Sequence, residues 1–245
     1  MKTIIIALSA LAAFAPLHAQ EKVSQNGNRV IKPGSQKGKI AFIVTQDEVP
    51  FGVFRDLAVE LAKDSLYNSV CEKAENGEPA ALKAKSKADI AVIIRADDTT
   101  PSLLAAVDDG WAVVNVRKLA EGLKTPEAVK KFHEKRCRSQ MLRAYVAVAG
   151  GFSSQYQGNI LSIRKISDFD LCETFIPNDA AMAMERYLAA RGVTPAIRKR
   201  YRSACQEGWA PAPTNDIQKA IWDEVHAIPT KPIKIEYNEK RDKGK

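Results

Sequence analysis

The chain has 245 residues, a formal net charge of +8 at pH 7 and 45% hydrophobic residues. This length suits one large domain or a domain with an extension. The basic residues concentrate late, in Arg198–Arg202 and Lys231–Lys245, without the interleaved aromatic residues of a nucleic-acid-binding motif, so nucleic acid is excluded from the expected partners.

The N-terminus is typical of a secretory signal peptide. Lys2 precedes an apolar run from Ile4 to Leu17, and the small residue Ala19 precedes Gln20. The run is shorter than the roughly 20 residues that a membrane-spanning helix needs. We therefore predict that residues 1–19 are cleaved, and that the protein is exported to the periplasm or the extracellular space with no transmembrane segment in its mature chain.

Strands are predicted to alternate with helices in the first half of the mature chain. A polar leader over residues 20–38 precedes an apolar run that predicts a strand over Ile40–Val44. Apolar residues at helical spacing then predict a helix over 52–71, and further apolar runs predict strands over 88–94 and 111–116. This order predicts an α/β (α+β layered) domain with a mixed sheet flanked by helices.

The segment from Thr125 to Gly151 predicts one long helix over 126–149. Thr125 is a suitable N-cap, Pro126 suits the first turn, and Gly150-Gly151 is a strong stop signal. A rival interpretation makes residues 145–149 a buried strand after a shorter helix, because short apolar runs fit either structure.

The C-terminal third is predicted to be mainly helical. Helices are expected over 178–190 and 195–205, with a last helix ending at Val225. The predicted organisation is a signal peptide over 1–19, a flexible leader over 20–38, an α/β domain over 39–172, a helical extension packed on it over 173–228, and a basic tail over 229–245.

All four cysteines follow the predicted signal peptide. An even number in an exported protein suggests two disulfides, with three possible connectivities. We favour Cys71–Cys137 and Cys172–Cys205. No CxxC spacing supports a metal site in their place.

The remaining chemistry-bearing residues do not form a recognisable catalytic motif. His133 and His226, the only histidines after residue 19, do not lie in an HExxH pattern. Ser153 and Ser154 follow two glycines, but GGFSSQYQG is not the GxSxG of a nucleophile elbow. A glycine cap followed by a polar loop is the simpler interpretation, and a hydrolase with a non-zinc active site stays an alternative.

The order of elements, with the segments WAVVNVRKL, MLRAYVAVAGG and NILSIRKISDFDL, resembles the archaemetzincin-like (metzincin-type) proteases over about Lys39 to Cys172. The resemblance implies a zincin-like core whose long helix carries HExxHxxxG. Placing the motif's glycine on Gly151 puts Arg143 and Ala144 at the first His and Glu positions and Ala147 at the second His position.

A shift of one residue, onto Gly150, places Leu142, Arg143 and Val146 there instead. Neither register supplies a zinc ligand or a catalytic base. The resemblance therefore implies a degenerate form that lacks the zinc-binding motif, and we expect no metal, no other cofactor and no metalloprotease activity.

The resulting functional hypothesis is an exported, non-catalytic binding or structural module of the cell envelope, with an unidentified ligand or envelope partner. We expect a ligand in a cleft that corresponds to the protease active site, lined by Arg143, Tyr145, Ala147, Phe152 and Tyr156. A basic protein that binds anionic surface polymers is a second alternative.

Overall fold

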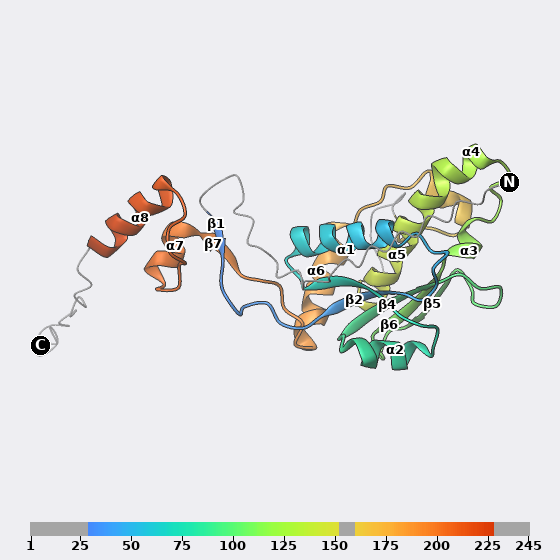
Figure 1. Ribbon diagram of the computed structural model, residues 1–245, viewed down its shortest axis with the longest axis horizontal. Helices are drawn as coiled ribbons and strands as arrows, with labels where there is room; N and C mark the ends of the chain where they lie inside the picture. The colour runs from blue at the N-terminus through green and yellow to red at the C-terminus, as the bar shows by residue number, and fades with distance from the viewer. Residues whose placement is uncertain (1–28, 152–159, 228–245) are drawn as a thin grey trace, which may run out of the picture. The chain divides into compact units, whose positions relative to one another are not determined.

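A computed structural model describes residues 29–151 and 160–227 (Figure 1). The chain divides into two compact units. One unit is Ile31–Arg198, and the described part of the other is Arg29, Val30 and Lys199–Ala227. Strands β1 (Arg29–Ile31) and β7 (Arg198–Arg200) form a two-stranded sheet, and the boundaries between the units fall within these two strands.

This division differs from the predicted one. Helix α6 (Asn178–Ala190), which the sequence assigned to an extension packed on the α/β domain after residue 172, belongs to the same compact unit as that domain. The predicted leader is also partly structured, because Lys37 forms a β-bridge with Thr194. The predicted signal peptide over 1–19 and the basic tail over 229–245 lie outside the described residues.

The larger unit is built on a five-stranded mixed sheet with the order β3-β2-β4-β6-β5. Strands β3, β2, β4 and β6 are parallel, and β5 is antiparallel to β6. The strands are β2 (Ile40–Val44), β3 (Ser69–Lys73), β4 (Ile90–Arg95), β5 (Leu103–Ala106) and β6 (Trp111–Asn115). The mixed sheet and the strands β2, β4 and β6 confirm the predicted fold class.

Helices cover both faces of the sheet (Figure 1). Helices α1 (Phe51–Ser65) and α5 (Glu134–Val148) lie on one face, and α2 (Pro79–Ser86) lies on the other. Alternate residues of β4 therefore enter two different cores: Val92 packs on the side of α1 and α5, and Ile93 on the side of α2 with Leu82. Burial on both faces explains why β2 and β4 are continuously apolar.

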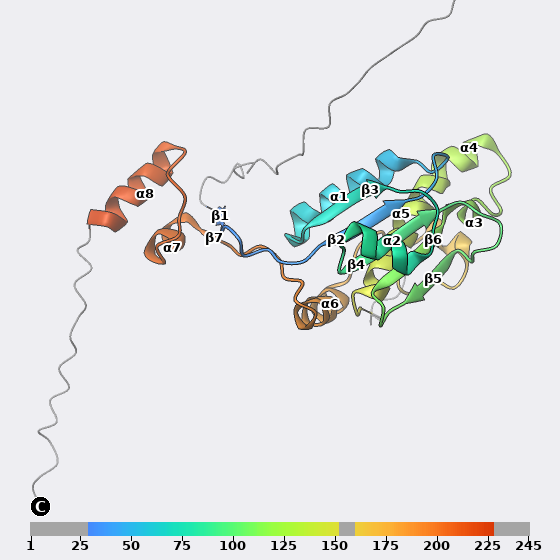
Figure 2. The same ribbon diagram turned by 60° about the horizontal axis from the view of Figure 1, so that its bottom comes forward.

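The predicted helix over 52–71 is wrong at its C-terminal end. Helix α1 stops at Ser65, Leu66 adopts a left-handed conformation with φ +61°, and residues from Ser69 onward form β3 (Figure 2). Strand β3 pairs with β2, with Phe42 opposite Cys71. Pairing with a distant strand decides this conformation, and helical spacing within the segment does not reveal it.

The structure also contains elements that the sequence did not predict. Helix α2 begins at Pro79, and β5 forms the edge of the sheet. The predicted helix over 195–205 is instead β7 followed by α7 (Tyr201–Gln206). The other elements are α3 (Val116–Leu119), the 3-10 helix η2 (Ile166–Asp170) and α8 (Asp216–Ala227).

The long helix is confirmed, and the rival strand over 145–149 is wrong. Helix α4 (Pro126–Ala128), the π-helical turn η1 (Val129–His133) and α5 follow one another without a break. The Thr125 side chain accepts a hydrogen bond of 3.2 Å from the Ala128 amide, so the expected cap is present. Within the described residues, no helix is long and apolar enough to cross a membrane.

Candidate functional site

Helix α5 places an apolar face against the sheet. Cys137, Met141, Ala144 and Val148 are completely buried in the larger core. The Tyr145 ring meets Phe42 of β2 edge-on, with 6.2 Å between ring centroids. The inner face of the helix is therefore part of the hydrophobic core.

The residues at the zinc-ligand and catalytic-base positions of the HExxHxxxG motif lie within or beside this packed face. Ala144 and Val146 are fully buried, whereas Arg143 and Ala147 are half-buried. The Arg143 guanidinium donates a hydrogen bond of 3.1 Å from Nη2 to the Ile163 carbonyl oxygen. Burial lowers the pKa of Arg143.

Zinc does not fit this donor set. A zinc site needs three or four nitrogen, sulfur or carboxylate ligands around one point, and neither register of the motif supplies one. Elsewhere in the described ranges, no group of three or more His, Cys, Asp or Glu side chains is placed to hold a metal ion. His133 contacts the Val116 carbonyl oxygen through Nε2 at 3.0 Å, and His226 stacks on Trp222 in the smaller unit.

The predicted cleft is not formed as expected around Tyr145. This side chain is only 2% exposed, and burial raises its pKa because the phenolate would be desolvated. Arg143 and Ala147 are half-buried beside it. Phe152 and Tyr156 lie outside the described residues, as do the candidate nucleophiles Ser153 and Ser154, so their role stays a prediction.

The predicted disulfides are absent, because all four cysteines are free thiols. Cys71 lies on the edge strand β3, whereas Cys137 lies on α5, which contacts β4, β5 and β6. Both side chains border the larger hydrophobic core, but each is a free thiol, so the structure does not form the predicted pair Cys71–Cys137. Cys172 and Cys205 are each buried as thiols.

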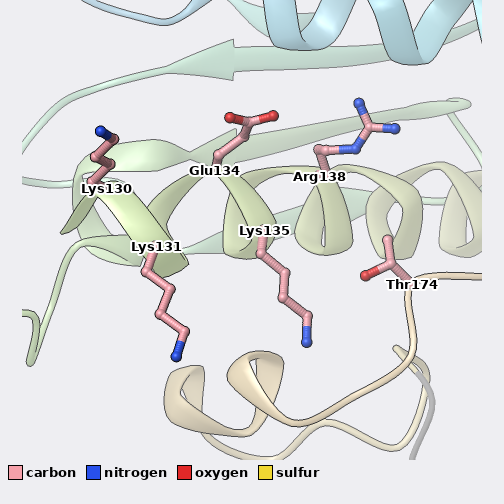
Figure 3. Close-up of a pocket in the computed structure, with 6 residues that line it drawn as sticks. All are labelled: Lys130, Lys131, Glu134, Lys135, Arg138 and Thr174. Carbon is pink, nitrogen blue, oxygen red and sulfur yellow. The ribbon is translucent and has the colours of Figure 1, made fainter. Parts of the chain in front are cut away.

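A basic hollow lies along the N-terminal half of the long helix (Figure 3). It has a volume of about 250 Å³ and is lined by Lys130, Lys131, Glu134, Lys135, Arg138 and Thr174. Figure 3 shows Lys131 and Lys135 pointing to one side of the helix, and Lys130, Glu134 and Arg138 pointing to the other. The helical spacing of these cations is visible in the sequence, whereas the predicted basic patches lie only near the C-terminus.

A second, larger hollow lies at the carboxyl ends of the parallel strands. Its volume is about 550 Å³, and three loops line it: the loop after β2, the loop between β3 and α2, and the loop after β4. The lining residues are Gln46, Asn76, Gly77, Glu78, Arg95, Asp97, Thr99 and Thr100. In the sequence, the only sign of this hollow is a polar residue after each apolar strand. The sequence does not give the strand order, so it could not show that these residues are neighbours in space.

No family model and no curated protein matches the sequence. The fold is similar to the crystal structure of archaemetzincin from Methanopyrus kandleri, with a TM-score of 0.50 and 13% sequence identity over 65% of this chain and 99% of that chain. A zinc-dependent peptidase from Methanocorpusculum labreanum matches with a TM-score of 0.42 and 12% identity, over 59% of this chain and 99% of that one. The first similarity confirms the predicted resemblance at the level of the fold alone.

Proposed function

We propose that this chain is an exported, non-catalytic binding module of the cell envelope, built on a zincin-like fold that does not hold zinc. The position of Arg143 and Ala144 carries the proposal. Ala144 is completely buried in the core, and Arg143 donates to the Ile163 carbonyl oxygen. These residues occupy the positions at which the resembling motif would supply a zinc ligand and the catalytic base.

The chemistry of this arrangement opposes metal binding. An arginine at the first ligand position is a donor only, so it has no lone pair for a cation. Alanine at the base position cannot take a proton from a metal-bound water. The half-buried guanidinium also places a positive charge where Zn²⁺ would bind.

Zinc content and peptidase activity test the absence of catalysis. We expect the purified protein, dialysed against zinc and then against buffer, to contain far less than one zinc per chain by mass spectrometry. We also expect no chelator-sensitive cleavage of a mixed peptide library. One tightly bound zinc per chain, with peptide cleavage that stops on chelation, would contradict the proposal.

Export is supported by the sequence of residues 1–20 and has its own test. The protein recovered from the envelope or medium is expected to begin at Gln20, and Leu8→Arg, which interrupts the apolar run, is expected to retain the uncleaved chain inside the cell. Recovery of the wild-type chain in the cytoplasm with its first residues intact would overturn this part of the proposal.

The basic hollow of Figure 3 favours a specific kind of partner, an anionic polymer of the cell surface. Two of its cations are already engaged: Lys135 donates to the Asp170 carbonyl oxygen at 2.8 Å, and Arg138 pairs with Glu60 at 2.5 Å. Lys130 has no ion-pair partner among the described residues, and Lys131 lies 4.9 Å from the centre of the Phe132 ring. These two lysines are therefore available to a polyanion.

A charge-matched pair of variants tests this partner. Lys130→Gln/Lys131→Gln is expected to elute from immobilised dextran sulfate at lower salt than the wild type. Ion pairs with the sulfate groups retain the protein on the column, and salt weakens these ion pairs by screening. Lys63→Gln/Lys85→Gln removes the same charge from exposed positions on α1 and α2 and serves as the control. Equal shifts for both double variants would show that net charge alone, and not this hollow, governs retention.

A further inference from the structure

The strand order creates a topological switch point between β2 and β4. From β2 the chain passes through α1 to β3 on one side, and from β3 it returns through α2 to β4 on the other side. Helices α1 and α2 lie on opposite faces of the sheet (Figure 1). The loops that leave the carboxyl ends of β2 and β4 therefore diverge, and open α/β sheets bind ligands in the crevice that such a divergence leaves.

The 550 Å³ hollow occupies this crevice. Gln46 comes from the loop after β2, Asn76 and Gly77 come from the loop before α2, and Arg95 ends β4. The volume lies within the range of small-molecule sites, which is about 300–1,000 Å³. The hollow lies on a different part of the fold from Arg143 and Ala144, which are on α5.

Arg95 supplies a cation with unused hydrogen-bonding capacity. Its Nη2 donates to the Gly77 carbonyl oxygen at 3.1 Å, which holds the guanidinium beside the start of α2. Its Nε is buried without an acceptor, and its Nη1 has none among the residues that the structure describes. No side chain caps the first turn of α2, whose amides add a partial positive charge.

The two carboxylates of the hollow are not equivalent. Asp97 accepts hydrogen bonds from the Thr100 amide at 2.6 Å, the Thr100 hydroxyl at 2.8 Å and the Thr99 amide at 3.0 Å. Burial alone would raise the pKa of Asp97, but these hydrogen bonds outweigh burial and lower it. Asp97 therefore shapes the loop, and the exposed Glu78 is the carboxylate that remains open to a ligand.

We infer that this crevice binds a small polar ligand through an oxyanion, a carboxylate or a phosphate, which the guanidinium of Arg95 holds. A planar guanidinium with free donors matches either group. The side-chain amides of Gln46 and Asn76, which have no partner in the described part of the chain, supply further hydrogen bonds to the ligand. The Glu78 carboxylate repels an anionic group, so it disfavours ligands whose anionic group does not contact the Arg95 guanidinium.

The test is a titration of the purified, isotope-labelled protein, followed by amide chemical shifts. Inorganic phosphate and succinate are added in separate arms, each at an ionic strength matched with sodium chloride. We expect one of the two anions to give saturable shifts at Gln46, Gly77 and Thr99, and the arm that saturates identifies the ligand as a phosphate or a carboxylate.

Three variants separate this site from general anion binding. Arg95→Gln is expected to weaken the binding about tenfold, because a charged hydrogen bond is lost. Glu78→Gln is expected to tighten it about threefold, because a like charge is removed. Arg186→Gln, an exposed arginine on α6, changes the net charge equally and is expected to leave the affinity unchanged.

The inference is overturned if neither anion saturates, if Arg186→Gln weakens binding as much as Arg95→Gln, or if the shifts centre on Lys130–Arg138. Should Arg95→Gln fail to fold, the Glu78→Gln variant decides: affinity that does not increase contradicts the inference. These outcomes are independent of the zinc and export tests, because the crevice does not include any residue of α5 or of the signal peptide.

Discussion

Arg136 and Asp170 join the long helix to the 3-10 helix that follows it in the chain. Nε and Nη2 of Arg136 donate to the two carboxylate oxygens of Asp170, each at 2.7 Å, and Nη1 donates to the carbonyl oxygens of Leu119 and Glu121 at 3.0 and 2.8 Å. The Arg136 side chain is only 4% exposed. Hydrogen bonding to Asp170 is the main cause that raises the pKa of Arg136.

Asp170→Ala is therefore expected to destabilise the protein by about 3 kcal/mol, because it leaves a buried guanidinium without its counter-charge. The measurement is the free energy of unfolding in urea. Glu60→Gln removes the carboxylate of the more exposed pair with Arg138 and is expected to cost less than about 1 kcal/mol. Similar losses of unfolding free energy in the two variants would show that burial of the Arg136–Asp170 pair does not increase its contribution to stability.

Gly150 is expected to be intolerant of a side chain. It has φ +87°, and a Cβ atom there would lie 2.5 Å from Cβ of Tyr187, on the helix α6 that packs against the end of α5. Gly150→Ala should cost about 3 kcal/mol, from left-handed strain together with overpacking. Gly122→Ala has a similar φ of +80° but no atom within 4 Å, so it isolates the strain at about 1 kcal/mol. Equal losses of stability in Gly150→Ala and Gly122→Ala would contradict the close approach of α6 to Gly150.

The thiols are expected to be reduced and unreactive in the native protein. Burial raises the pKa of Cys71 to about 12 and that of Cys137 to about 12, so little thiolate forms at neutral pH. Iodoacetamide is expected to leave Cys137 unmodified in native protein, and to alkylate four thiols in urea without prior reduction. A native chain that requires a reductant before it alkylates would restore the predicted disulfides.

Stability is expected to fall at alkaline pH. The folded state raises the thiol pKa from 9.0 to about 12 at Cys137, so between these values the folded chain keeps a proton that the unfolded chain releases. The contribution is fully present below about pH 9 and is lost as the pH rises toward 12, at about 1.4 kcal/mol per pH unit for each such thiol. Urea unfolding at several pH values, with Cys137→Ala for comparison, measures the slope. If the unfolding free energy of Cys137→Ala falls with pH as steeply as that of the wild type, Cys137 does not cause the alkaline loss of stability.

Elements with local signals could be predicted closely. Thr125, Pro126 and Gly150-Gly151 bound the long helix in both the sequence and the structure, because caps and glycine stops act within a few residues. The helix over 178–190 coincides with α6, which is followed by Gly192 in a left-handed conformation. The predicted helix over 52–71 failed after Ser65, because its last residues pair with β2 and that partner lies far away in sequence.

The candidate sites divide in the same way. The sequence showed that Arg143, Ala144 and Ala147 are not metal ligands, because this depends only on residue type. It placed Tyr145 in a cleft and Cys71 in a disulfide with Cys137, and both depend on what lies opposite in space. Tyr145 faces Phe42 in the core, and Cys71 is on the far edge of the sheet from β5.

By itself, the sequence determined the alternation of strands and helices, the capped helix after Thr125, and the lack of zinc-binding side chains in its last part, from Ser139 to Gly151. Hydrophobic periodicity, capping and ligand chemistry are properties of neighbouring residues. Only the tertiary structure decided that β2 lies between β3 and β4, and that Gln46, Gly77 and Arg95 therefore meet around one crevice. Strand order arises from pairing and packing between distant segments, and these interactions exist only once the chain has folded.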